Sequence, residues 1–127
     1  TEGLVRIAEH YIEIEAYAFA EAIYREIIAQ APDDMWYKIK YGEILGAQGS
    51  HDAALKLFME ILEAAPESPY SAQKLDELFE KVNHPEQRIK FWRALSESNR
   101  EAAVPQYHLG LALEAAGQVE EAAAGRD

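Results

Sequence analysis

Charged side chains of opposite sign recur along this sequence at a fixed spacing. A basic residue stands three positions before a glutamate at three places, 34 residues apart: Arg6 with Glu9, Lys40 with Glu43, and Lys74 with Glu77. On a helix, residues i and i+3 are neighbours, so each pair can neutralise itself. The pairs are then either a solvated ladder of salt bridges or a row of groups that binds the amides and polar side chains of an extended peptide.

The residue types that usually catalyse reactions are not arranged for catalysis. No two of the four histidines are four residues apart, as paired metal ligands on one helix would be. The chain has no cysteine, which excludes disulfides, thiolate chemistry and cysteine-ligated zinc. No Ser-His-Asp order, phosphate-binding glycine loop or dinucleotide fingerprint occurs. We therefore expect no enzyme activity, no metal site and no cofactor.

The overall charge favours some partners over others. The 127 residues include 23 acidic and 12 basic side chains, which gives a net charge of −11. This charge repels a phosphate backbone and attracts a basic peptide or protein surface, so we expect a protein or peptide partner and no nucleic acid. The uninterrupted apolar runs are too short to span a bilayer, which argues against membrane insertion. We expect a soluble protein of the cytoplasm or the periplasm, since a lack of cysteine suits both.

The sequence repeats itself with a period of 34 residues. Shifting it by that distance aligns columns of similar residues: Ile7, Tyr41, Leu75 and Leu109; Ala8, Gly42, Asp76 and Gly110; Tyr11, Leu45, Phe79 and Leu113; Ala20, Ala54, Arg88 and Ala122; and Tyr24, Phe58 and Trp92. The register predicts one domain of four repeats, 1–34, 35–68, 69–102 and a truncated 103–127. Because the chain starts at Thr1 instead of methionine, we expect it to be a piece of a longer protein.

Each repeat is predicted to contain two amphipathic helices. Apolar residues recur at positions i, i+3, i+4 and i+7 in both halves of a repeat. Gly49, Asn83 and Gly117 fall between the two halves, where a left-handed residue ends a helix. The fourth repeat should therefore turn at Gly117 and start a short second helix at Val119.

These features resemble the tetratricopeptide repeat family. That family has a small residue in the first helix (helix A), another early in the second helix (helix B), aromatic residues after each, and a closing proline. Ala8 with Ala20, Gly42 with Ala54, and Gly110 with Ala122 match its small pairs, and Pro32 and Pro66 match its proline. The resemblance covers essentially the whole chain and implies an all-α, right-handed superhelical solenoid of antiparallel helix pairs.

In this family, partners usually lie in a concave groove lined by the A helices. Projected onto this sequence, the resemblance places the partner-contacting residues at Arg6, Glu9, Trp36, Ile39, Lys40, Glu43, Tyr70, Lys74, Glu77 and Tyr107. His108 falls in the same row as Arg6, Lys40 and Lys74. Trp36 could equally pack between two repeats.

The third repeat departs from the family pattern. Asp76 and Arg88 stand where the two small residues should be, and they have opposite charges. One interpretation is an ion pair across a wider helix crossing, and the other is that each side chain points to solvent.

We expect the chain to be a protein-interaction module that holds a peptide or protein segment in its groove. A self-assembling segment that stacks through an exposed C-terminal helix, as a homo-oligomer, is an alternative. A regulatory segment of a larger protein is another.

Overall fold

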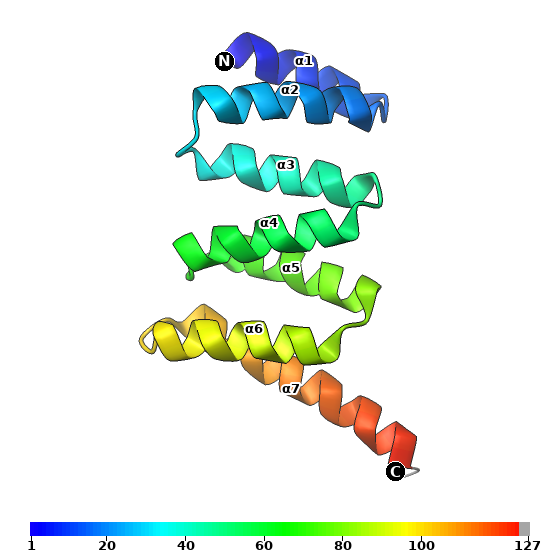
Figure 1. The fold of residues 1–127 in the computed structure, drawn as a ribbon, viewed down its shortest axis with the longest axis vertical. Helices are drawn as coiled ribbons and strands as arrows, with labels where there is room; N and C mark the ends of the chain where they lie inside the picture. The colour runs from blue at the N-terminus through cyan, green and yellow to red at the C-terminus, as the bar shows by residue number, and fades with distance from the viewer. Residues whose placement is uncertain (125–127) are drawn as a thin grey trace. The chain divides into compact units, whose positions relative to one another are not determined.

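A computed structural model describes the backbone of residues 1–124 and the side chains of residues 1–117. Within residues 1–124 the chain forms helices and no strand (Figure 1). In chain order the helices are α1 (Glu2–Glu13), α2 (Tyr17–Gln30), α3 (Met35–Ala47), α4 (His51–Ala64), α5 (Pro69–Val82), α6 (Pro85–Ser98) and α7 (Ala103–Ala124). The predicted all-α class is confirmed. The chain divides into two compact units, Thr1–Ile61 and Leu62–Asp127.

The predicted helix ends are confirmed in the first three repeats. Asp34 caps α3 by accepting a hydrogen bond from the backbone N–H of Trp36 at 3.0 Å. Ser68 caps α5, and Pro69 occupies the first turn, where its missing N–H leaves no helical bond unmade. Gly49 and Asn83 end helices in the left-handed conformation, with φ of 83° and 55°.

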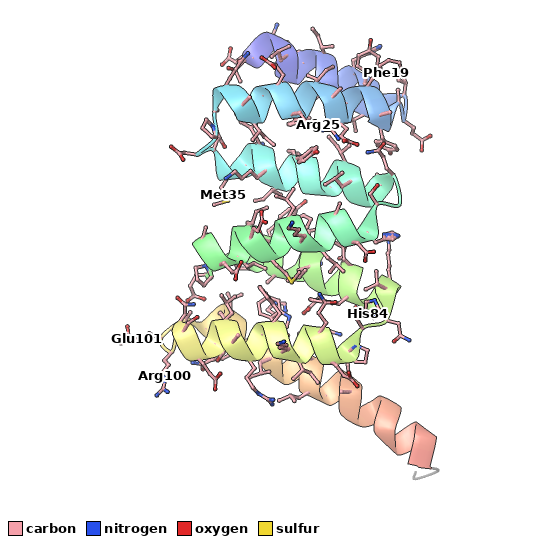
Figure 2. The ribbon with its side chains drawn as sticks, in the orientation of Figure 1. Phe19, Arg25, Met35, His84, Arg100 and Glu101 are labelled. Atoms are coloured by element: carbon pink, nitrogen blue, oxygen red, sulfur yellow. The ribbon has the colours of Figure 1, made fainter. Side chains whose placement is uncertain are left out.

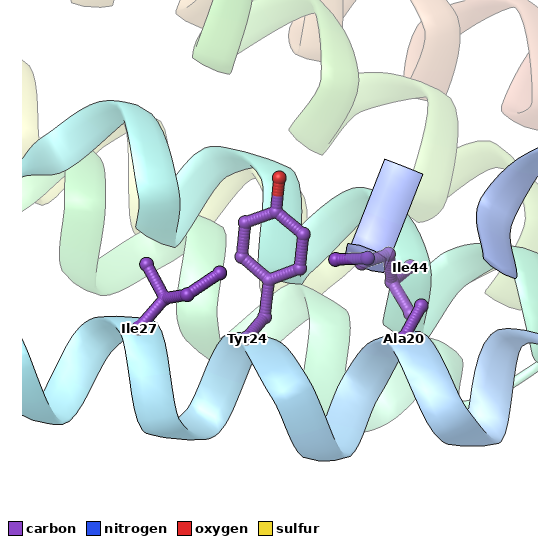
Figure 3. Packing of buried hydrophobic residues seen from close by; sticks show 5 residues of the cluster. Ala20, Tyr24, Ile27 and Ile44 are labelled. Atoms are coloured by element: carbon purple, nitrogen blue, oxygen red, sulfur yellow. The ribbon is translucent and has the colours of Figure 1, made fainter. Parts of the chain in front are cut away.

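The first unit packs around a small apolar cluster. Ala8 of α1 and Ala20 of α2, a predicted small pair, are both fully buried there. Ala20, Tyr24 and Ile27 rise from the same side of α2, and Ile44 of α3 belongs to the same cluster (Figure 3). Burial raises the pKa of the Tyr24 hydroxyl, and the nearby negative charges of Glu9 and Glu43 raise it further.

The crossing of α3 and α4 depends on a glycine. A Cβ on Gly42 would lie 2.7 Å from Cε2 of Phe58, which is closer than two carbons can approach. Phe58 is buried and cannot swing away. The predicted need for a small residue at 42 is therefore confirmed, although its nearest neighbour is Phe58 and not Ala54.

The fourth repeat differs from the prediction. α7 runs without a break from Ala103 to Ala124, so the turn expected at Gly117 is absent from this structure. The expected close crossing at Gly110 is absent too, because Gly110 is exposed and a Cβ there would meet nothing within 4 Å. The side chain of Ala122, the predicted partner of Gly110, lies outside the described residues. A glycine inside a helix costs only about 1 kcal/mol relative to alanine, so Gly117 permits a turn without forcing one.

Candidate functional site

An aromatic residue, a lysine and a glutamate form a linked group on α3. Nζ of Lys40 lies 4.8 Å from the centre of the Trp36 ring, close enough for a cation–π contact. The same Nζ is 3.9 Å from Oε1 of Glu43. Trp36 itself is 55% exposed. Because positions i, i+4 and i+7 share one helix face, the three side chains form a continuous surface, which we call the aromatic–lysine–glutamate motif.

The same motif occurs on α5. Nζ of Lys74 lies 5.5 Å from the centre of the Tyr70 ring and 3.8 Å from Oε1 of Glu77. Gln73 extends it by donating to Oε2 of Glu77 at 3.3 Å. Tyr70 is 43% exposed. Each unit of the chain thus has one copy, and corresponding residues of the two copies are 34 positions apart in the sequence.

The remaining predicted contact residues do not repeat the motif. Arg6 and Glu9 of α1 are both exposed, and within the described residues no ion pair joins them. Ile39 is only 8% exposed, so its prediction as a contact anchor is wrong: its side chain belongs to the core. Tyr107 of α7 is 65% exposed and is available for contact.

The second unit contains a buried charge cluster around Asp76 of α5. Its Oδ1 accepts hydrogen bonds from Nε of Arg88 at 3.1 Å and from Nε1 of Trp92 at 2.8 Å, both on α6. Its Oδ2 lies 2.5 Å from Nδ1 of His108 on α7. The predicted ion pair between Asp76 and Arg88 is confirmed, and it is nearly buried instead of lying at the surface.

The other members of this cluster were not predicted. His108 was placed with the exposed basic residues, but it is buried and stacks on the Trp92 ring at 4.8 Å between centroids. Trp92 is fully buried and provides its indole N–H to the carboxylate. The prediction for His108 failed because its partner lies 32 residues away, beyond the reach of helical spacing. The cluster therefore serves to hold α7 against α5 and α6.

A second polar contact fixes the start of α7. Glu67, in the loop before α5, accepts hydrogen bonds from the backbone N–H groups of Ala103 and Val104 at 3.2 and 2.8 Å. A carboxylate at a helix N-terminus satisfies free N–H groups and interacts favourably with the helix dipole.

Exposed apolar side chains gather at the α1–α2 end of the chain. Ile7, Ile14 and Phe19 are large and exposed, and the Phe19 ring stacks on Tyr11 with 5.3 Å between centroids. Figure 2 shows Phe19 near the turn between α1 and α2. This surface lies apart from the α3 motif in sequence and provides a comparison for it.

Metal binding and membrane crossing find no support in the part of the chain that the structure describes. No group of three or more potential ligands there could hold a metal ion. Among the helices of residues 1–124, none is both long and apolar enough to cross a membrane.

Comparison with known proteins identifies relatives by fold only. No protein-family model matches the sequence, and no curated protein matches it. Two structures of MamA, one of them from Desulfovibrio magneticus RS-1 and the other the RS-1 ArsTM double mutant, superpose with a TM-score of 0.70 at 18% identity. The matches cover 94% of this chain and 67–68% of MamA.

PcrH, in complex with the chaperone binding region of PopD, superposes with a TM-score of 0.62 at 13% identity, over 99% of this chain and 92% of PcrH. These proteins are helical solenoids of the tetratricopeptide type. This chain has a tetratricopeptide-like helical solenoid fold. At such low identity the likeness concerns the fold and does not identify a partner.

Proposed function

We propose that this chain is a non-catalytic protein-interaction module that binds an extended segment of another protein through its aromatic–lysine–glutamate motifs. The observation that carries the proposal is the repetition of the motif, with the same two contacts, on α3 and α5. A row of salt bridges that served only solubility would not need an exposed tryptophan and tyrosine beside the lysines. PcrH, which shares the fold, is seen with a segment of PopD, so the fold is compatible with this role.

The motif has the chemistry of a peptide contact. Exposed tryptophan and tyrosine are the residue types that most often dominate binding energy. The cation–π contact holds each ring in place before binding, which lowers the entropy lost when a partner is bound. Lysine and glutamate next to the ring offer a donor and acceptors to the partner's backbone. The net charge of −11 favours a segment that carries basic residues.

Peptide selection tests the proposal. A random peptide library displayed on phage is selected on the chain, and the affinity of the recovered peptides is measured by calorimetry. We expect basic peptides with apolar anchors, and we expect Trp36→Ala and Tyr70→Ala each to weaken binding at least about tenfold, as hot-spot residues do. Phe19→Ala is the matched control, since it removes an exposed aromatic ring outside the motifs. Selected peptides that are indifferent to both motif substitutions would contradict the proposal.

Self-association is the second candidate function. The exposed Ile7, Ile14 and Phe19, together with the exposed Leu113 of α7, favour it because exposed apolar patches mark interaction surfaces. Sedimentation across a wide range of concentration separates the two functions. A constant monomer mass supports peptide binding alone, and a mass that rises with concentration supports self-association.

A further inference from the structure

Left-handed residues recur in this chain with the period of the repeat. Within the described residues, positive φ occurs at Glu15, Gly49 and Asn83, with values of 58°, 83° and 55°. These positions are 34 residues apart, and each lies between the two helices of a repeat: α1 and α2, α3 and α4, α5 and α6. The fourth position of the series is Gly117, where α7 continues as a helix.

Glycine is the residue best suited to the conformation that this series requires. It adopts positive φ without the steric penalty that the Cβ of Glu15 or Asn83 incurs. In a helix, by contrast, glycine is disfavoured relative to alanine by about fivefold in the equilibrium constant. The residue type at 117 thus favours the turn over the helix in which it is found.

The straight course of α7 leaves one of its faces uncovered. In the first unit the small residue of α1, Ala8, is buried in a cluster with Ala20 of α2. The corresponding Gly110 of α7 is exposed, and a Cβ at that position would meet nothing within 4 Å. Leu113 is 43% exposed, whereas its counterparts Leu45 and Phe79 are 7% and 2% exposed. This face of α7 has the residues of a helix crossing and lacks the second helix.

The described contacts that hold α7 all lie before Gly117. Glu67 binds the N–H groups of Ala103 and Val104, Asp76 binds His108, and Ala112 is the last fully buried residue of the helix in the described part of the chain. A turn at Gly117 would therefore leave these contacts intact.

We propose that α7 is a two-state element hinged at Gly117. One state is the straight helix of this structure. In the other, Gly117 takes a left-handed conformation and residues 118–124 fold back over Gly110 and Leu113. The sequence fits this closure, because Ala122 stands in the column of Ala20 and Ala54, where the small residue of a second helix is needed. The occupant of the uncovered face is thus the chain's own terminal segment.

A pair of cysteines distinguishes the two states. The chain contains no cysteine, so Gly110→Cys with Ala122→Cys introduces a single possible disulfide. In the straight helix the two Cα atoms are roughly 18 Å apart, and a disulfide requires less than about 7 Å. We expect an intramolecular disulfide to form under mild oxidation, detected by mass spectrometry and by faster migration on a non-reducing gel. Ala8→Cys with Ala20→Cys is the control, because those positions correspond to 110 and 122 three repeats earlier.

A second measurement tests the hinge itself. Adding Gly117→Ala to the cysteine pair favours the helix and penalises the left-handed turn, so we expect the rate of disulfide formation to fall at least about tenfold. Gly3→Ala is the matched control, since Gly3 is an exposed glycine of α1 with open space around it and lies at no turn. Equal rates for the Gly117 and Gly3 variants would overturn the proposal.

The remaining outcomes are also decisive. If the 110–122 pair stays reduced while the 8–20 control oxidises, α7 is straight only. If the disulfide joins two chains, the uncovered face belongs to a second copy, and the proposed closure is wrong. Neither result bears on peptide binding, because none of the substituted residues belongs to the motifs of α3 and α5.

Discussion

At the residue scale, Asp76 is the side chain on which the second unit most depends. It is a buried carboxylate that receives hydrogen bonds from α6 and lies beside an imidazole nitrogen of α7. A buried charge is tolerated only when it is paired and hydrogen-bonded, and Asp76 meets this condition with Arg88, Trp92 and His108. Removal of the carboxylate leaves all three groups without it in a nearly dry environment.

We predict that Asp76→Ala lowers the free energy of unfolding by about 3–5 kcal/mol, measured by urea denaturation, because it strands a buried guanidinium. Substitution of Asp76 and Arg88 together by leucine should cost less than Asp76→Leu alone, since no charge is then left uncompensated. Glu77→Ala is the control, because its neighbouring carboxylate is largely exposed and its ion pair is worth about 1 kcal/mol or less. Equal losses from the single and double leucine variants would show that the pair is not coupled.

Tyr24 makes the first unit sensitive to alkali. Its pKa lies above the ordinary phenol value of 10.0 because of burial and of the nearby carboxylates. Its hydroxyl therefore ionises first in the unfolded chain. The associated stability is complete below about pH 10 and is lost as the pH rises through the folded-state pKa.

We predict that Tyr24→Phe reduces the fall in the free energy of unfolding above about pH 10, measured by chemical denaturation at a series of pH values. Tyr107→Phe is the control, because that tyrosine is exposed and its removal should leave the alkaline slope unchanged. Identical slopes for the wild type and Tyr24→Phe would contradict the assignment.

The sequence was informative about residues where the repeat register placed an anomaly. Asp76 and Arg88 stood out because both replaced small residues with opposite charges, and the structure joins them. His108 and Ile39 were assigned wrongly, since position in a repeat does not reveal how a particular helix rotates toward its neighbours. The contact between His108 and Asp76 depends on the packing of α7, which no local pattern in the sequence encodes.

At the scale of the elements, close helix crossings depend on small residues. α3 and α4 approach so closely that Gly42 has the Phe58 ring where its side chain would be. Most helices were predictable because amphipathic spacing, capping residues and left-handed turn residues agreed with one another. α7 was predicted incorrectly where only the turn residue was present, and no described packing contact beyond Ala112 favours the bend.

We predict that Gly42→Ala destabilises the protein by about 1–3 kcal/mol through overpacking against Phe58, even though alanine is the better helix former. Gly3→Ala should instead stabilise it by up to about 1 kcal/mol, because Gly3 has open space around it. Thermal and urea unfolding measure both. If Gly42→Ala were as stable as Gly3→Ala, α3 and α4 would have to lie further apart than described.

At the scale of the whole molecule, an excess of negative charge acts against the folded chain. The net charge of −11 on 127 residues produces repulsion that the compact state feels more strongly than the unfolded chain. The same charge directs encounters toward basic partners, and both effects weaken with salt.

We predict that raising sodium chloride from about 0.01 M to about 0.1 M, which shortens the Debye length from about 30 to about 10 Å, raises the unfolding temperature. An increase of roughly 2–5 °C corresponds to about 1 kcal/mol or less for a domain of this size. Choline chloride at the same ionic strength should have the same effect, because screening does not depend on the identity of the cation. A rise with sodium chloride alone would indicate specific ion binding instead.

The order in which the partners of Asp76 leave the ribosome gives the second unit a schedule. Arg88 follows Asp76 by 12 residues, Trp92 by 16 and His108 by 32. At a synthesis rate of about 10 residues per second, the carboxylate waits about three seconds for its last partner. The apolar cluster of the first unit needs no residue beyond Ile44 and can form well before then. A nascent chain that stalls before His108 therefore presents a finished first unit and a half-satisfied Asp76, which is the kind of exposed intermediate that chaperones bind.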